Sequence, residues 1–308
     1  MEILYINANE QANIAASCMA LGYFDGLHLG HQELLHTVSK IAESKGLKKA
    51  LMTFDKHPRE LIRNEVNPHL STLDDKIKIL ESYAFDYLLI VHFDQNFLTL
   101  SPQQFIQQYI INYCVKHVVC GFDYRFGYLG VGDVALLQKK SKQQFGVTVV
   151  NAQKYNEHKV SSTYIKNLLH QGDIQLANTL LGRKYNITGE VIHGYKRGKK
   201  ELGFATANTV SENYVIPKTG VYGVMVQVKS EMYYGMANIG YNPTFGILDK
   251  PSLEVHLFGF NDDIYGEVIT VFFEMHLRGE VRFSSKEELI VQLQNDKQMI
   301  KAYFNITN

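Results

Sequence analysis

The feature that most constrains the fold is the stretch 19–32, which reads MALGYFDGLHLGHQ. An apolar run ends at Gly22, and a helix-forming segment follows His31. A buried strand, a glycine turn and a helix start together hold phosphate groups, because free backbone N–H groups and the positive end of the helix dipole face the ligand. Gly30 lacks a Cβ where a triphosphate has to come close, and His28 and His31 can lie on one face of the first helical turn. The stretch therefore predicts a phosphate-binding corner.

The composition predicts a two-domain protein of the cytoplasm. The chain has 308 residues, and its 31 basic and 31 acidic side chains give no net charge, so we expect neither nucleic acid nor a membrane as partner. The three cysteines, Cys18, Cys114 and Cys120, are too few and too apolar in context for a disulfide framework, which suits a reducing compartment. The sequence shows no signal-peptide pattern and no apolar run of membrane-spanning length. It predicts no particular oligomeric state.

The first part of the chain, up to about residue 182, alternates apolar strands with amphipathic helices. Helix-start signals are Thr72 with Asp75, and Ser101 followed by Pro102. The alternation predicts a parallel sheet covered on both faces, with ligands at the carboxyl ends of its strands. The expected strands are 18–21, 50–54, 87–92, 117–121 and 147–150, and the expected helices are 32–44, 73–84, 102–113 and 134–145.

From residue 185 onward, short alternating strands follow one another without helices, which predicts an antiparallel barrel or sandwich. A closing helix is expected over 286–303, with Ser285 and Glu288 as its capping box. We expect Leu289, Ile290, Leu293, Ile300 and Tyr303 to lie on one face of this helix. The domain ranges predicted in this way are 1–183 and 184–308. The expected strands are 186–192, 221–228, 232–238, 253–258 and 268–273.

Four further stretches carry polar groups, and each has a structural as well as a functional interpretation. The stretches 53–58 (TFDKHP) and 121–127 (GFDYRFG) follow predicted strands, where they form either ordinary turns or ligand contacts. Residues 160–166 (VSSTYIK) contain hydroxyls suited to a helix cap. Residues 194–208 (GYKRGKKELGFATAN) form either a solvated basic turn or a nucleotide loop. Glu254 lies in an alternating strand, where an acid can simply face solvent.

The strings GYFDGLHLGH and LGFATAN, the latter followed by NIGYNPTF, resemble the two signatures of the bacterial bifunctional riboflavin kinase/FMN adenylyltransferases, or FAD synthetases. The resemblance runs in order from Gly22 to the final helix. It implies an N-terminal Rossmann-like HxGH nucleotidyltransferase domain with a parallel sheet and a C-terminal antiparallel β-barrel riboflavin kinase domain with a closing helix. It also implies two reactions: ATP phosphorylates riboflavin to FMN, and a second ATP adenylylates FMN to FAD with release of pyrophosphate. The implied substrates are thus riboflavin, FMN and ATP, and the implied cofactor is Mg²⁺.

The resemblance carries roles over to matching positions. For adenylyl transfer it implies His28 and His31 as catalytic residues, and it implies flavin contacts at His57, Asp123 and Phe126. The implied ATP contacts there are Gly22, Phe24, Asp25, Gly30, Ser161, Ser162, Thr163 and Lys166. For the kinase it implies Glu254 as general base, Thr206 and Asn208 as metal ligands, and Asn238 and Arg278 as flavin contacts. The implied nucleotide contacts of the kinase are Gly194, Gly198, Lys199, Gly203, Thr206 and Asn208.

Four positions depart from the strictest motifs: Lys56, Lys166, Lys199 and Ala205. Lys166 stands where the family has arginine, so it keeps the charge but loses the planar fork that grips two phosphate oxygens. Three alternatives therefore stay open. Only one of the two activities is efficient, or the chain is a different HxGH nucleotidyltransferase, such as one acting on pantetheine phosphate, with a flavin-binding regulatory domain. The third is a flavin-binding regulator without catalysis.

Overall fold

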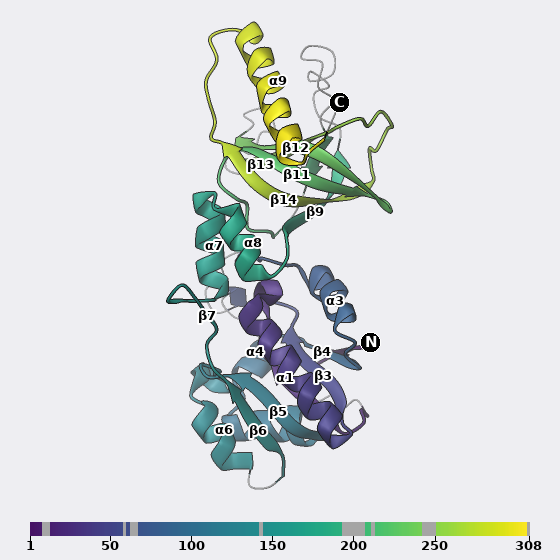
Figure 1. The fold of residues 1–308 in the computed structure, drawn as a ribbon. Coiled ribbons are helices and arrows are strands. Elements are labelled where there is room, and N and C mark those ends of the chain that lie inside the picture. Colours follow the sequence, from purple (N-terminus) through teal and green to yellow (C-terminus); the bar gives the residue numbers. More distant parts are fainter. Residues whose placement is uncertain are drawn as a thin grey trace. The chain divides into compact units, whose positions relative to one another are not determined.

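The computed structural model describes residues 1–7, 13–57, 60–61, 67–141, 144–192, 207–210, 213–241 and 251–306. Its contacts divide the chain into two compact units, Met1–Ser162 and Thr163–Asn308. Figure 1 shows the elements of both units with the labels used below. In the described residues, no helix is both long enough and apolar enough to cross a membrane.

The first unit is built on a six-stranded parallel sheet in the order β1-β4-β3-β2-β5-β6. After β2 the chain adds β3 and β4 on one side, and it later adds β5 and β6 on the other. The strand order therefore reverses between β2 and β5, where parallel sheets form a ligand crevice at the carboxyl edge. The strands are β1 (Glu2–Ile6), β2 (Ser17–Leu21), β3 (Lys48–Phe54), β4 (Tyr87–Val91), β5 (Val115–Gly121) and β6 (Gly146–Val150).

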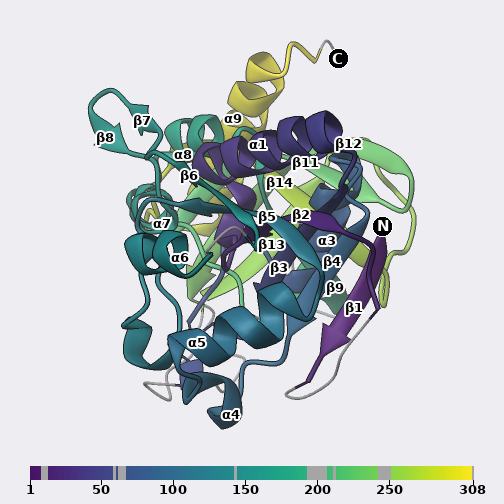
Figure 2. The same cartoon turned by 90° about the horizontal axis from the view of Figure 1, so that it is seen from below.

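Helices cover both faces of this sheet, as the alternation predicts. Cys18 and Ala20 of β2 face the core beneath α1 and α3, whereas Met19 and Leu21 face the core beneath α5 and its continuation. Figure 2 shows α1 and α5 on opposite sides of the strands. The helical segments of this unit are η1 (Asp25–Leu27), α1 (Leu29–Lys45), α3 (Leu73–Ser82), α4 (Gln95–Leu98), α5 (Pro102–Phe105), η2 (Ile106–Ile111), η3 (Tyr128–Gly130) and α6 (Val134–Ser141), and β7 (Lys154–Tyr155) pairs with β8 (His158–Lys159).

The predicted helix starts are confirmed by their hydrogen bonds. Thr72 and Asp75 form a reciprocal capping box on α3, in which each backbone N–H donates to the other side chain. Ser101 caps α5 in the same way with Gln104, and Pro102 occupies the first turn. The single helix expected over 102–113 is wrong in detail, because the chain widens into the π-helix η2 after α5.

The second unit begins with two helices, α7 (Ser162–Gln171) and α8 (Ile174–Leu181), and continues as a closed antiparallel barrel in the order β10-β13-β12-β11-β14-β9. Alternate side chains such as Tyr185, Tyr222 and Phe273 fill its interior. Asn178 joins α8 to the barrel, since its amide donates to the Phe273 carbonyl at 2.8 Å. The strands are β9 (Tyr185–Ile192), β10 (Ala207–Val210), β11 (Gly220–Val228), β12 (Glu231–Tyr241), β13 (Pro251–Leu257) and β14 (Val268–Arg278).

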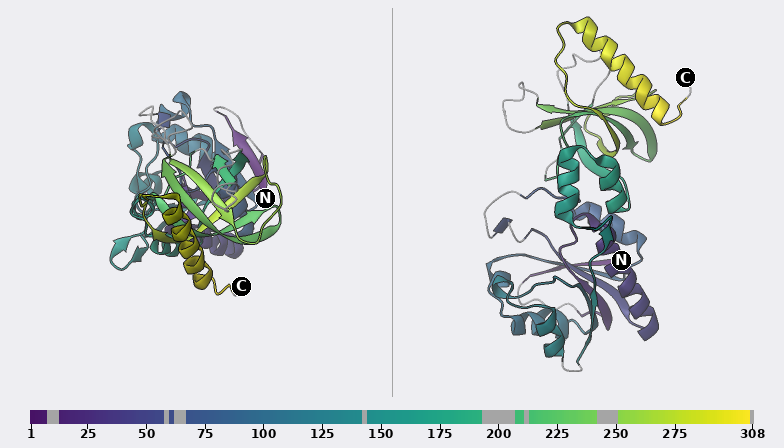
Figure 3. Two further views of the ribbon diagram at one scale, coloured as in Figure 1. Left: turned by 90° about the horizontal axis from the view of Figure 1, so that it is seen from above. Right: turned by 60° about the vertical axis from the view of Figure 1, so that its left-hand side comes forward.

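Helix α9 (Lys286–Tyr303) has the predicted bounds and lies against the outside of the barrel (Figure 3). Leu293 and Ile300 contact Val221 and Met236 there. Tyr303 is 42% exposed, and the buried face includes the carboxylate of Asp296, which is 0% exposed.

The capping box expected at the start of α9 is half formed. The Ser285 hydroxyl accepts from the Glu288 N–H at 3.2 Å, but the Glu288 carboxylate accepts from the N–H of Ser284 rather than Ser285. The cap still satisfies one of the free amides of the first turn.

Candidate active sites

The corner between β2 and α1 has an unusual backbone. Phe24, Gly26 and Leu27 all have positive φ angles, of 58°, 81° and 45°. Glycine adopts this region freely, but Phe24 and Leu27 do so at a cost of order 1 kcal/mol each or more, which burial of their side chains in the core offsets. The corner is therefore a defined shape held by the core, at the sheet edge where the strand order reverses.

His28 and His31 lie together at the start of α1. His28 is the N-cap residue, and its Nδ1 accepts from the His31 backbone N–H at 3.3 Å. Because Nδ1 accepts, the proton of the neutral ring is on Nε2, which is then the donor. The two imidazole rings stack with centroids 3.7 Å apart and an angle of 14°. His31 Nδ1 is buried and has no hydrogen-bond partner among the described residues.

The space left by Gly30 holds the His28 ring. A Cβ at this position would lie 3.2 Å from His28 Cε1 and 3.8 Å from the Val160 carbonyl oxygen. We expected this glycine to make room for a triphosphate; in the structure it first makes room for the histidine. Gly22 acts similarly, since a Cβ there would lie 3.1 Å from the Phe24 ring.

Both histidines are neutral at neutral pH. Burial lowers the pKa of His28 to about 4, a shift that nearby Asp25 and Asp123 oppose and Lys159 reinforces. Burial, followed by the neighbouring His28 and Lys76, holds the pKa of His31 well below its usual value. Uncharged rings can stack closely, and each then carries one donor and one acceptor nitrogen. The pair is thus suited to donating hydrogen bonds to phosphate oxygens, not to acting as a pair of cations in the free protein.

Asp25 ties the corner to two other segments. Its Oδ1 accepts from the Leu70 N–H at 2.7 Å, and its carbonyl accepts from the Ser162 hydroxyl at 2.9 Å. The Gly26 N–H donates to the Ser71 hydroxyl. Phe24 is buried, and its ring makes a T-shaped contact with the His31 ring. The structure therefore brings Gly22, Phe24, Asp25, His28, Gly30, His31 and Ser162 together, with half-buried Ser161 just before Ser162.

The other residues expected around the adenylyl-transfer site differ in their settings. Asp123 accepts from Lys159 Nζ at 2.6 Å, and the charges of both act on His28. The rings of His57 and Tyr23 make a T-shaped contact with their centroids 4.6 Å apart. Phe126 is buried in the core against Phe105, so its expected flavin contact stays a prediction. Lys56 and Thr163 are exposed and Lys166 is half-buried; the last two lie on α7 in the second unit.

In the barrel, strand register places four expected kinase residues in one row. Asn208 of β10 pairs with Glu254 of β13, Glu254 pairs with Asn238 of β12, Asn238 pairs with Val221 of β11, and Val221 pairs with Arg278 of β14. Directly opposed residues project their side chains to the same face, with Cβ atoms about 5 Å apart. Val221 contacts Ile300 of α9 in a shared cluster, so this is the outer face. We call these five residues the outer row.

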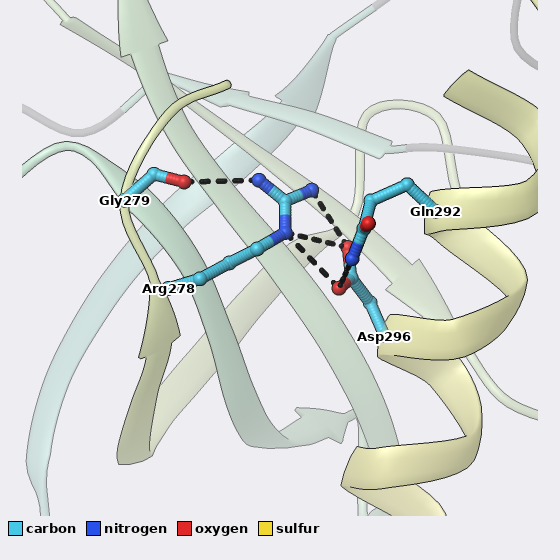
Figure 4. A network of polar contacts seen from close by, with 4 residues as sticks. All are labelled: Arg278, Gly279, Gln292 and Asp296. Carbon is cyan, nitrogen blue, oxygen red and sulfur yellow. Dashed lines mark hydrogen bonds and ion pairs between the residues drawn. The ribbon is translucent and has the colours of Figure 1, made fainter. Parts of the chain in front are cut away.

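Members of the outer row differ in burial and partners. Asn208 is 8% exposed, and its Oδ1 is a buried oxygen without a hydrogen-bond partner among the described residues. Glu254 is half-buried and Asn238 is exposed. Arg278 donates through Nε and Nη2 to the carboxylate of Asp296 on α9, as Figure 4 shows. The expected flavin contact of Arg278 is therefore combined with a structural role that sequence reasoning did not foresee.

The expected nucleotide loop of the kinase, with Gly194, Gly198, Lys199, Gly203, Ala205 and Thr206, lies outside the described residues, as do residues 242–245 of the second motif.

Comparison with known proteins matches the two halves of the chain to two families. A FAD synthetase family model matches residues 10–164 and a riboflavin kinase family model matches residues 181–304. A bifunctional riboflavin kinase/FMN adenylyltransferase of Bacillus subtilis is 44% identical over 296 residues, covering 94% of this chain and 93% of its own. The corresponding proteins of Listeria monocytogenes and Escherichia coli are 43% and 35% identical, covering 93% and 96% of this chain and 92% and 96% of theirs.

The chain belongs to the bifunctional riboflavin kinase/FMN adenylyltransferase family.

A solved structure from Streptococcus pneumoniae has the same fold as this family member. It superposes with a TM-score of 0.87 at 32% identity, covering 97% of this chain and 99% of its own. That structure is named a macrolide-efflux protein, which disagrees with the names of the relatives above. The two family models and the curated relatives agree with one another over nearly the whole chain, and the assignment rests on them.

One residue of the corner was missed by sequence reasoning. Lys76 of α3 is 3% exposed, and its Nζ donates to the Tyr23 carbonyl at 3.0 Å and lies 3.9 Å above the Tyr23 ring. Its charge acts on His31. The sequence contains a signal for this residue. Positions 73, 76, 77 and 80 have the spacing of the buried face of α3, and position 76 holds a lysine where an apolar residue is expected. In this family member, Lys76 is a buried positive charge beside the histidine pair.

Proposed function

We propose that this chain makes FMN from riboflavin in its barrel and FAD from FMN at the corner between β2 and α1. In this proposal residues 1–183 form the adenylyltransferase domain and residues 184–308 the riboflavin kinase domain. The observation that carries the proposal is the presence of both signatures in order, with the first at a parallel-sheet corner and with Asn208 and Asn238 of the second on one row of a closed barrel. We further propose a reducing, cytoplasmic compartment, supported by three cysteines that are all unpaired in the structure.

Adenylyl transfer needs no nucleophilic side chain. A phosphate oxygen of FMN attacks the α-phosphorus of ATP, the bond to the bridging oxygen breaks, and pyrophosphate leaves. The protein then has to align the reactants and stabilise the charge that develops on the phosphate oxygens. The Nε2–H of neutral His28, the free N–H groups at the start of α1 and the buried charge of Lys76 are suited to this. His31 stacks on His28 and supports it.

The residues proposed to bind ATP at the corner are Gly22, Phe24, Asp25, Gly30, Ser161, Ser162, Thr163 and Lys166, and those proposed to bind the flavin are His57, Asp123 and Phe126. Asp25 and Ser162 support the binding of ATP by fixing the corner, through the hydrogen bond between the Ser162 hydroxyl and the Asp25 carbonyl.

In the kinase step, the 5′-hydroxyl of riboflavin attacks the γ-phosphorus of ATP and ADP leaves. The hydroxyl proton needs an acceptor close to the reacting oxygen, and we assign this role to Glu254, in the middle of the outer row. Asn238 and Arg278, farther along the same row, are the proposed flavin contacts. The proposed nucleotide contacts are Gly194, Gly198, Lys199, Gly203, Thr206 and Asn208.

The described residues fit a magnesium ion at the Asn208 end of the row. Asn208 Oδ1 is a hard oxygen donor that is buried without a hydrogen-bond partner in the described part of the chain. We propose that Asn208 and Thr206 hold Mg²⁺, which shares its remaining coordination with phosphate oxygens and water. When bound, the ion neutralises charge on the phosphates of ATP.

The test is incubation of the purified chain with riboflavin and MgATP, with the flavins separated by chromatography over time. We expect FMN to appear first and FAD to follow. Each step is then assayed alone. The kinase step is measured as the loss of supplied riboflavin, and the adenylyl-transfer step as the formation of FAD from supplied FMN. A chain that binds FMN but consumes no ATP would refute the proposal, and a chain that performs one step only would limit it to that domain.

A further inference from the structure

Arg278 and α9 are joined by an ion pair whose carboxylate is buried. The Asp296 carboxylate accepts from Arg278 Nε at 3.0 Å through both oxygens and from Nη2 at 2.7 Å. Gln292, one turn earlier on α9, donates to the same carboxylate at 2.8 Å. Asp296 is 0% exposed, whereas the Arg278 side chain is 20% exposed. The pair, drawn in Figure 4, thus has a buried acidic end and a partly exposed basic end.

The arrangement leaves part of the guanidinium available. An arginine has five N–H donors, and the contacts in the structure use one on Nε, one on Nη2 and one on Nη1, the last donating to the Gly279 carbonyl at 2.9 Å. Among the described residues, two N–H groups, one on each terminal nitrogen, have no acceptor. Because the group is held at Nε and at both terminal nitrogens, these two donors point in fixed directions.

The charge of this arginine is already balanced. The Asp296 carboxylate compensates the guanidinium at close range, so an anionic ligand is not required to make the site neutral. Two oriented N–H donors with a compensated charge suit an uncharged acceptor such as a carbonyl oxygen or a hydroxyl. Riboflavin, the substrate that enters the kinase, is uncharged and rich in such oxygens.

We propose that Asp296 is a positioning residue for riboflavin, which fixes the Arg278 guanidinium at the end of the outer row so that its two remaining N–H groups receive a neutral oxygen of the flavin. The inference rests on the proposed kinase function of the barrel. It assigns the flavin side of the site to the edge between β14 and α9, because that is where Arg278 lies in the row that contains Glu254. Helix α9 is thereby part of the substrate site, although it offers the flavin no direct contact through Asp296.

The experiment compares Asp296→Asn with Glu287→Gln, an exposed acid-to-amide change on the same helix. Riboflavin phosphorylation is measured at varied riboflavin and at varied MgATP. For Asp296→Asn we expect KM for riboflavin to rise at least tenfold, while KM for ATP stays within about twofold of the parent. Glu287→Gln should change neither. A folded Asp296→Asn variant with an unchanged KM for riboflavin would overturn the proposal.

A second variant keeps the test decisive if Asp296→Asn does not fold. Arg278→Lys retains a cation beside Asp296 but lacks the fork of N–H donors. We expect it to raise KM for riboflavin without changing KM for ATP, and thermal unfolding checks that the barrel is intact. A purely structural role would instead lower stability and leave the two KM values in their original ratio. A parent chain without kinase activity would refute the proposed function itself, which separates the two failures.

Discussion

At the scale of single residues, the corner combines two tasks in one side chain. His28 caps α1 through Nδ1 and leaves Nε2–H as its donor, and Gly30 provides the space that its ring occupies. The geometry therefore fixes both the tautomer and the orientation of the proposed catalytic group before any ligand binds. Such preorganisation lowers the cost of aligning a donor with a developing charge.

The neutral state of His28 predicts a pH dependence of stability. Its pKa is about 4 in the folded chain and near 6.5 when unfolded, so below pH 6.5 the unfolded state binds a proton that the folded state does not. The free energy of unfolding should therefore fall as the pH drops from 6.5 to 4, by up to about 3 kcal/mol from this residue. Denaturant titrations across this range measure the loss.

The matched variant is His28→Asn, which keeps a capping oxygen but does not titrate. The slope of its free energy of unfolding against pH should be smaller over the same window, because unfolding of the variant takes up about one proton fewer. Equal slopes for the parent and the variant would show that His28 is not the titrating group.

Lys76 yields a second prediction at this scale. Lys76→Met keeps the length of the side chain but removes the charge beside His31, so FAD formation from supplied FMN should fall by roughly tenfold, equivalent to about 1.4 kcal/mol. In this variant the acid limb of the pH profile of FAD formation should move to higher pH, because the charge of Lys76 no longer opposes protonation of His31. The control is Lys78→Met, an exposed lysine on the same helix. Identical profiles for both variants would exclude this role.

At the scale of elements, α9 is held by a cap at its start and by a buried ion pair along its length. Leu293 and Ile300 supply the apolar contact with the barrel, and Asp296 lies between them on the same face. A buried carboxylate is costly unless it is paired, and Arg278 and Gln292 provide its partners. The position of α9 is thus specified by polar geometry as well as by burial.

The cap predicts a measurable stability change. Ser285→Ala removes the acceptor of the Glu288 N–H and should destabilise the barrel unit by about 1 kcal/mol. Ser284→Ala is the control, since Ser284 contributes its backbone N–H to the Glu288 carboxylate, which alanine retains. Thermal unfolding followed by circular dichroism compares the two. A larger loss for Ser284→Ala would mean that the cap is assigned to the wrong serine.

At the scale of the whole molecule, the residues proposed to act in the two reactions, His28 and Glu254, lie in separate compact units. His28→Ala should abolish FAD formation from supplied FMN and leave FMN formation intact, because Glu254 and its row are untouched. Glu254→Ala should do the reverse. Chromatography of the flavins measures FMN and FAD in separate assays of the two steps. Loss of both activities in either folded variant would contradict independent sites.

Local signals explain what the sequence could predict. The starts of α3, α5 and α9 follow from short-range caps such as Thr72 with Asp75, and β2 follows from an uninterrupted apolar run. The edge strand β1 was missed, and within it only Ile6 is buried. Residues whose role depends on distant partners were also missed. Lys76 contacts Tyr23 across 53 positions in the chain, and Asp296 reads as an ordinary helix-surface acid until Arg278 is placed beside it.

The candidate sites also combine features set by local sequence with features set by distant partners. The approach of His28 to His31 follows from helix geometry, whereas the pairing of Asn208 with Glu254 and Asn238 depends on strand register, which local patterns in the sequence do not reveal. Family resemblance grouped these residues without giving their arrangement.

The outer row also has a consequence for how the enzyme is made. Its five residues come from the five consecutive strands β10 to β14, so the row exists only after β13 has paired with β10 and β14 has paired with β11. A chain renatured from denaturant would regain the power to phosphorylate the vitamin only after these two pairs had formed. The return of that single turnover is therefore a clock for the pairing of strands that are not neighbours in the sequence.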